Sequence, residues 1–223
     1  MLLAREFNPS ILAEHWLVKH GIIPEDPRER QIIAVPGFTR IETAHFTIEA
    51  RADRAQLTIG QPEQDTAQDI VTDKVGKIVG LLPETPYAAV GLNFHWAVVS
   101  PDRERVAAGL RTMFVKDDSA IYALFGSDDA RFGGYLSKES MGFRLRLDIK
   151  PISAEHEVGG RATPAEGVLY QFNYHRDLQP DVAIGQVREA LSRWADARDE
   201  SDGIFHSTMG WMADGSREDA AAT

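Results

Sequence analysis

Two segments of this sequence, far apart along the chain, repeat the same order of side chains that could do chemistry. Asn93 and His95 flank an aromatic residue, and so do Asn173 and His175. In an extended strand successive side chains point to opposite faces, so each asparagine shares a face with its histidine while the ring points to the other. Neutral imidazole is a common metal ligand and a general base near pH 7. If the two strands are neighbours, the four polar side chains form one candidate ligand patch.

A catalytic or metal-binding role is only one interpretation of this patch. A carboxylate from Glu49 or Asp148 could complete it, which would suit a metal-assisted reaction. A three-residue pattern has low specificity, however, and asparagine and histidine also occupy sheet faces that meet solvent or another chain. The sequence therefore leaves the catalytic residues, any metal and any cofactor unknown.

A row of basic side chains lies on another expected strand. Arg144 and Arg146 alternate with apolar residues, and Lys150 continues the row. Guanidinium groups bind carboxylates and phosphates through two parallel hydrogen bonds, so the row predicts contacts with an anion or with an acidic partner. The alternative is that an acidic residue on a neighbouring strand, for example Glu49, balances the charge.

The glycine-rich segment 126–134 is the third candidate. It holds Asp128, Asp129 and Arg131, and its carboxylates could bind a cation or enter a cleft. The spaced carboxylates and the closing glutamate of an EF-hand are missing. A surface turn in which Arg131 pairs with a nearby carboxylate is the simpler interpretation.

Composition and missing motifs narrow the range of functions. The sequence contains none of the short motifs that mark phosphate-binding loops, dinucleotide-binding turns, nucleophile elbows or zinc-protease helices. It contains no cysteine, which excludes disulfides, thiolate catalysis and cysteine-based metal sites. The formal net charge of −10 repels a phosphate backbone, so we expect no nucleic-acid partner. No apolar run is long enough to cross a bilayer, and we expect no membrane partner and a cytoplasmic location.

Hydrophobic periodicity predicts the elements that position these residues. Four segments alternate apolar and polar residues with the period of two that predicts strands: 43–60, which forms a hairpin, 88–99, 142–150 and 167–176. Apolar residues recur at helical spacing in four others: 9–20, 66–82, 101–114 and 184–194. Asn8 and Ser100 are the expected N-caps of the first and third helices, and 153–166 is an expected loop. Because the strands alternate, we predict an α+β fold with a predominantly antiparallel sheet and helices packed mainly on one face.

We expect one α+β domain over residues 1–200 and a C-terminal segment, 201–223, that is partly disordered. Within that segment Trp211 and Met212 are apolar residues that need a surface to dock on. The leading hypothesis is a non-enzymatic binding or assembly protein of the bacterial cytosol, which associates with itself as a homodimer or with a protein partner. The alternative is a small-molecule-binding enzyme, metal-assisted in one version, that uses His95 and His175.

Overall fold

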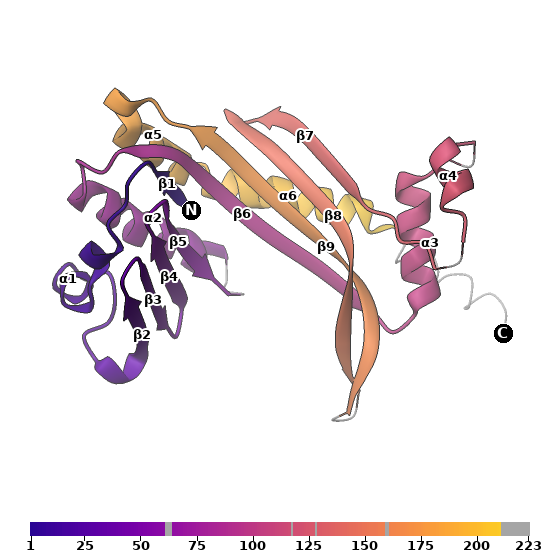
Figure 1. Cartoon of the computed structure of the whole chain (residues 1–223), viewed down its shortest axis with the longest axis horizontal. Helices are drawn as coiled ribbons and strands as arrows, with labels where there is room; N and C mark the ends of the chain where they lie inside the picture. The colour runs from indigo at the N-terminus through magenta and orange to yellow at the C-terminus, as the bar shows by residue number, and fades with distance from the viewer. Residues whose placement is uncertain (61–63, 117, 128, 159–160, 211–223) are drawn as a thin grey trace. The chain divides into compact units, whose positions relative to one another are not determined.

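The computed structural model describes residues 1–60, 64–116, 118–127, 129–158 and 161–210. Within these residues nine strands form one antiparallel sheet, in the order β2-β3-β4-β5-β1-β6-β9-β8-β7 (Figure 1). The predicted α+β class, with its predominantly antiparallel sheet, is confirmed. No helix in this part of the chain is both long enough and apolar enough to span a membrane.

The elements follow one another along the chain with these bounds. The strands are β1 (Leu2–Ala4), β2 (Arg30–Val35), β3 (Phe38–Thr43), β4 (Phe46–Arg51), β5 (Arg54–Ile59), β6 (Tyr87–Ser100), β7 (Gly134–Ser140), β8 (Phe143–Val158) and β9 (Arg161–Asp177). The α-helices are α1 (Glu14–Lys19), α2 (Gln64–Leu81), α3 (Arg103–Phe114), α4 (Ala120–Leu124), α5 (Ala183–Ser192) and α6 (Trp194–Thr208). Short 3-10 helices are η1 (Pro9–Leu12), η2 (Pro27–Glu29) and η3 (Pro180–Val182).

The chain forms two compact units, each assembled from three stretches of sequence. The first unit holds Met1–Leu92, Met141–Phe143 and His175–Ala197, and the second holds Asn93–Ser140, Arg144–Tyr174 and the residues from Arg198 onward. The strands β6 and β9 contribute residues to both units. One domain over residues 1–200 stays a prediction.

In the first unit, β3, β4 and β5 turn their apolar side chains toward α1 and α2. Ile41 and Ile48 are cross-strand partners and are almost fully buried, together with Leu17 of α1 and Ile78 of α2. Burial of an apolar side chain of this size contributes about 1.5–3 kcal/mol. Gly37 follows a proline in the tight turn between β2 and β3, and its φ of +79° is the conformation that a type II turn requires there.

In the second unit, β6 and β9 pack aromatic side chains against α6. Tyr170 and Tyr174 of β9 are fully buried, and Phe205 of α6 meets Tyr170 edge to face with ring centroids 5.2 Å apart. Trp96 of β6 stacks on Phe205 at 5.8 Å and donates a hydrogen bond from Nε1 to the buried Ser201 Oγ, 3.0 Å away. The ring of Trp96 therefore packs on a helix that the sequence pattern does not predict.

The first and third predicted helices differ from the prediction in different ways. Asn8 caps its element as expected, because its side chain accepts a hydrogen bond from the amide of Ser10. The extended backbone of Ala13 then divides the expected helix into η1 and α1. The N-cap of α3 is Asp102, whose side chain accepts from the amide of Arg105, whereas Ser100 is the last residue of β6.

The sequence predicts a loop over 153–166, but the described residues of this segment belong to strands: β8 continues to Val158 and β9 begins at Arg161. A side chain at Gly133 would meet the carbonyl of Ile149, so β7 begins beside this part of β8. Pro151 lies beyond the part of β8 that is beside β7. Its missing N–H therefore removes no hydrogen bond between β7 and β8.

The polar sequence after Ala195 forms most of α6, which crosses the expected boundary at residue 200. Its inward positions include Ala197 and Ser201, which are fully buried but small or polar. The helix therefore lacks the long apolar stripe by which helices are recognised in a sequence. Trp211 and Met212 lie outside the described residues.

Candidate functional site

The two asparagines of the repeated pattern lie side by side on the neighbouring strands β6 and β9. Asn173 donates a hydrogen bond from Nδ2 to Asn93 Oδ1 at 2.5 Å. This bond leaves the Nδ2 of Asn93 and the Oδ1 of Asn173 without a partner among the described residues. The pair therefore presents the amide nitrogen of Asn93 as a donor group and the amide oxygen of Asn173 as an acceptor group to whatever meets this face.

The antiparallel direction of β6 and β9 separates the two histidines. Each histidine lies two residues after its asparagine, so moving along the two strands leads away from the asparagine pair in opposite directions. His95 remains with Asn93 in the second unit, whereas His175 belongs to the first unit and lies 3.1 Å, Nε2 to Oδ1, from Asp177. Among the described residues, no group of three or more His, Asp or Glu side chains could hold a metal ion.

A hollow of about 350 Å³ surrounds the asparagine pair on the second unit. It is lined by Asn93, His95, Tyr135, Arg146, Asp148, Gln171, Phe172 and Asn173, which come from β6, β7, β8 and β9. Hydrogen-bonding side chains dominate this lining, and the imidazole of His95 has no hydrogen-bond partner in the described part of the chain. The hollow can therefore bind polar groups without first breaking bonds to His95.

Arg146 is the cation of this hollow, and its surroundings differ from those of Arg144. The guanidinium of Arg144 forms an ion pair with Glu139 of β7 at 3.1 Å. Arg146 is exposed and makes no ion pair or hydrogen bond within the described residues. Glu49, which the sequence offers as a balancing carboxylate, pairs with Arg40 at 3.0 Å in the first unit. Arg146 is thus a solvated guanidinium available to a ligand.

Sequence reasoning misses Tyr135 and Gln171 of this hollow. Gln171 follows from the same period of two that places Asn173 on the polar face, so the signal for it is present in the sequence. Tyr135 belongs to β7, whose sequence GYLSKES has too few apolar residues for a strand to be predicted. Asp148, the suggested completing carboxylate, accepts from Lys150 Nζ at 3.4 Å.

The glycine-rich segment 126–134 contributes an arginine to an ion cluster around the buried carboxylate of Glu166. Arg131 donates to Glu166 Oε1 at 2.8 Å, and Arg103 of α3 donates to the same oxygen at 2.7 Å. Burial acts to raise the pKa of Glu166, but the two guanidinium groups outweigh it and hold the pKa below its ordinary value. The carboxylate partner of Arg131 is thus distant in sequence, unlike the local one in the simple turn interpretation. Asp128 lies outside the described residues.

A second polar network ties α6 to β7 and β9. Glu200 Oε1 accepts from Lys138 Nζ at 2.6 Å, and Glu200 Oε2 accepts from Ser140 Oγ at 2.7 Å and from the Tyr174 hydroxyl at 3.0 Å. Burial acts to raise the pKa of Glu200, and these three donors lower it further than burial raises it. Burial and the adjacent carboxylate raise the pKa of Tyr174, so its hydroxyl stays protonated and donates. The network is structural, because every group in it already has a partner.

Comparison with protein-family models, with curated proteins and with solved structures found no match.

Proposed function

We propose that the chain is a non-enzymatic binding protein and that its second unit recognises a carboxylate on a protein partner. The binding surface is the amide–arginine face, which comprises Asn93, His95, Arg146, Gln171 and Asn173. One observation carries the proposal: Arg146, whose guanidinium has no partner among the described residues, lies in a hollow that is otherwise lined mainly by hydrogen-bonding side chains. A guanidinium binds a carboxylate through two parallel hydrogen bonds, and amides can bond the remaining oxygen lone pairs.

Binding suits these groups better than catalysis does. Carboxamides do not act as acids or bases near neutral pH, so the three carboxamides among the five side chains serve recognition only. A general base in an enzyme is normally oriented by a third group that fixes its tautomer, and within the described residues His95 has no such partner. His175 has one in Asp177, but it belongs to the other unit.

A second copy of the chain is the partner that we propose first. The chain carries 34 acidic residues against 24 basic ones, so its own surface supplies carboxylates in excess. Two-fold dimers are the commonest soluble assemblies, and arginine is enriched in interfaces. We therefore propose that the protein acts in the cytoplasm and that self-association depends on Arg146 of the amide–arginine face.

The test compares two arginines on the same strand. Sedimentation velocity at micromolar concentrations should show a dimer for the natural chain, weakened about tenfold or more by Arg146→Gln. Arg144→Gln is the matched control, because its guanidinium is already paired with Glu139. Equal dimerisation of both variants would contradict the role of Arg146.

A monomer at all concentrations would exclude the second copy as partner, and a carboxylate probe then decides the proposal. Titration of ¹⁵N-labelled protein with a hexaglutamate peptide should shift the side-chain amide resonances of Asn93 and Asn173. Arg146→Gln should suppress these shifts and Arg144→Gln should not. If neither assay responds to Arg146, the amide–arginine face is not a carboxylate-binding surface.

A further inference from the structure

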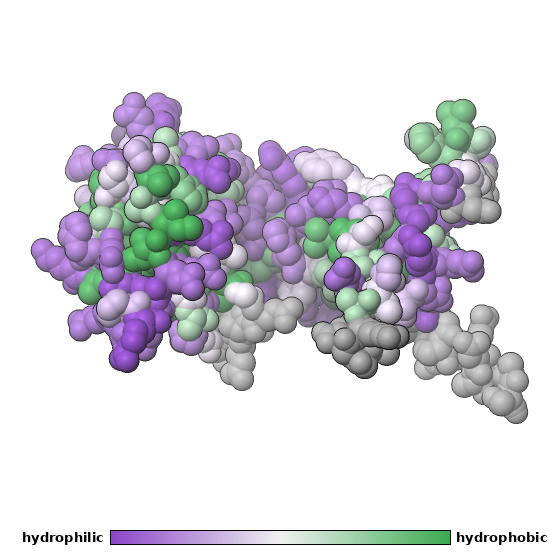
Figure 2. Space-filling view, turned by 60° about the horizontal axis from the view of Figure 1, so that its bottom comes forward, coloured by the Kyte–Doolittle hydropathy of each residue, from purple (hydrophilic) through white to green (hydrophobic). Residues whose placement is uncertain are grey.

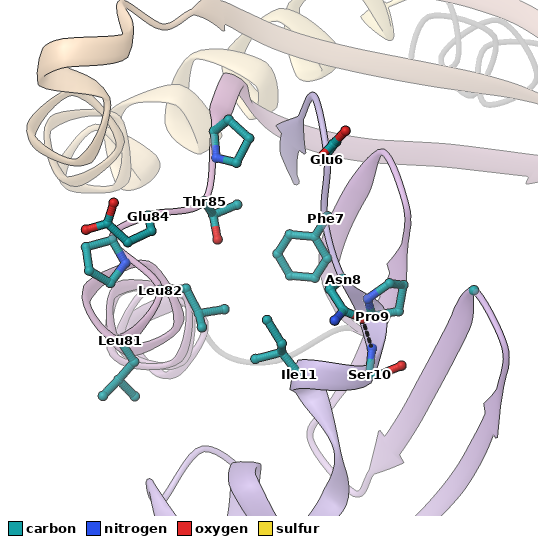
Figure 3. A pocket seen from close by; sticks show the side chains of 13 residues that line it. Glu6, Phe7, Asn8, Pro9, Ser10, Ile11, Leu81, Leu82, Glu84 and Thr85 are labelled. Atoms are coloured by element: carbon teal, nitrogen blue, oxygen red, sulfur yellow. Dashed lines mark hydrogen bonds between the residues drawn. The ribbon is translucent and has the colours of Figure 1, made fainter.

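A second hollow lies in the first unit and differs from the amide–arginine face in its chemistry. It has a volume of about 670 Å³ and lies between the segment 6–11 and the segment 81–86 that follows α2. The side chains of Phe7, Ile11 and Leu82 point toward one another across it (Figure 3). Ile11 and Leu81 are 37% and 40% exposed, so apolar surface is left open to solvent here. Figure 2 shows hydrophobic side chains gathered on this unit, at the left of the view.

The walls of this hollow, which we call the apolar hollow, are held by local structure. Asn8 caps η1, and three prolines of the two lining segments restrict the backbone. On the opposite wall Leu82 N donates to Ile78 O at 3.1 Å, and Thr85 N donates to Leu82 O at 3.2 Å. A site formed in advance in this way loses little conformational entropy when a ligand enters.

The rim of the apolar hollow is acidic. Glu6 and Glu84, from opposite segments, line it, and no Lys or Arg does so in the part of the chain that the structure describes. Both are exposed, and neither makes an ion pair with a described residue. An apolar floor with carboxylates at its rim is complementary to an apolar side chain flanked by a cation.

We propose that the apolar hollow docks a segment of a partner protein in which one or two large apolar side chains are flanked by Lys or Arg. Its volume accommodates side chains of that number and size. An anionic membrane surface is disfavoured, because Glu6 and Glu84 would be repelled by it. The C-terminal segment of this chain is disfavoured for the same reason, since Asp214, Glu218 and Asp219 outnumber its one arginine.

The experiment uses the full chain and two fluorescent hexapeptides with the same central Leu-Phe pair. One peptide carries flanking lysines and the other carries flanking glutamates, and binding is followed by fluorescence polarisation. The lysine peptide should bind about tenfold more tightly than the glutamate peptide. The double variant Glu6→Gln/Glu84→Gln should remove this preference, and Ile11→Asp should abolish binding of the lysine peptide.

The control for Ile11→Asp is Ile33→Asp, which introduces the same charge at an apolar β2 side chain that is 55% exposed and lies outside the hollow. Circular dichroism checks that each variant is folded. The proposal is overturned if the lysine peptide does not bind, if both peptides bind equally, or if Ile11→Asp and Ile33→Asp behave alike. Binding of anionic lipid vesicles in preference to the lysine peptide would also overturn it and assign the hollow to a membrane surface.

Discussion

Removing the hydroxyl of Tyr174 tests how the second unit is held together. Tyr174 donates to Glu200 Oε2 at 3.0 Å from a fully buried position on β9. A hydrogen bond to a charged group contributes about 1.5–3 kcal/mol to stability. Glu200 keeps Lys138 and Ser140 as donors after the Tyr174→Phe substitution. The free energy of unfolding should therefore fall by an amount at the lower end of this range, about 1.5–2 kcal/mol at pH 7.

The pH dependence of this loss distinguishes the hydrogen bond from mere packing. The pKa of Glu200 is lower in the native state than in the unfolded chain. The stabilisation from its charge is therefore fully present above the unfolded pKa and is lost as the pH falls through the native one. The destabilisation caused by Tyr174→Phe should shrink over that acidic range, because a protonated Glu200 is a weaker acceptor.

Urea unfolding followed by tryptophan fluorescence measures both quantities. The matched control is Tyr135→Phe on β7, whose hydroxyl has no hydrogen-bond partner among the described residues and whose side chain is exposed; it should change stability by less than about 0.5 kcal/mol. Losses of equal size for the two variants, or a loss for Tyr174→Phe that does not depend on pH, would refute this account of the Glu200 network.

Three further substitutions probe the packing of the second unit. Phe94→Ala should destabilise the protein by about 3–5 kcal/mol, because this β6 ring is buried; a loss below about 1 kcal/mol in urea unfolding would contradict its inward assignment. Gly167→Ala should cost about 1–3 kcal/mol, since the added carbon would collide with the backbone carbonyl of Val98, and an unchanged melting temperature would argue against that close approach. Arg131→Ala should cost about 1–2 kcal/mol and raise the pKa of Glu166, measured by NMR titration; an unaltered titration would show that the ion pair is absent in solution.

Much of the sheet could be predicted from the sequence, because its strands follow the period of two. The core strands β6, β8 and β9 and the helix α2 lie where periodicity places them. The edge strands β2 and β7 were not predicted, since their exposed positions remove the alternation on which the prediction depends. The helix α6 was missed for the related reason that its buried face includes Ala197 and Ser201.

In the candidate site, too, the features set within one strand could be predicted, whereas those set by neighbouring strands could not. The shared face of Asn93 and His95 follows from strand geometry alone. The bond between Asn93 and Asn173 depends on strand order, and the separation of His95 from His175 depends on strand direction. Neither order nor direction is encoded in the period of a single strand. The free guanidinium of Arg146 was likewise unpredictable, because which arginine finds a partner depends on the neighbouring strand β7.

Each unit is built from three separate stretches of chain, so neither unit can finish folding until its last stretch has been synthesised. The helices α2 and α5 of the first unit pack against each other, yet α5 ends only at Ser192. Emerging from the ribosome, residues 1–92 therefore wait for more than a hundred further residues before their own unit can close. Contacts between such distant residues slow folding, and the exposed apolar surface must be protected meanwhile. A nascent chain stopped before Ala183 lacks α5 altogether, so it should engage chaperones more strongly than one stopped after Ala197.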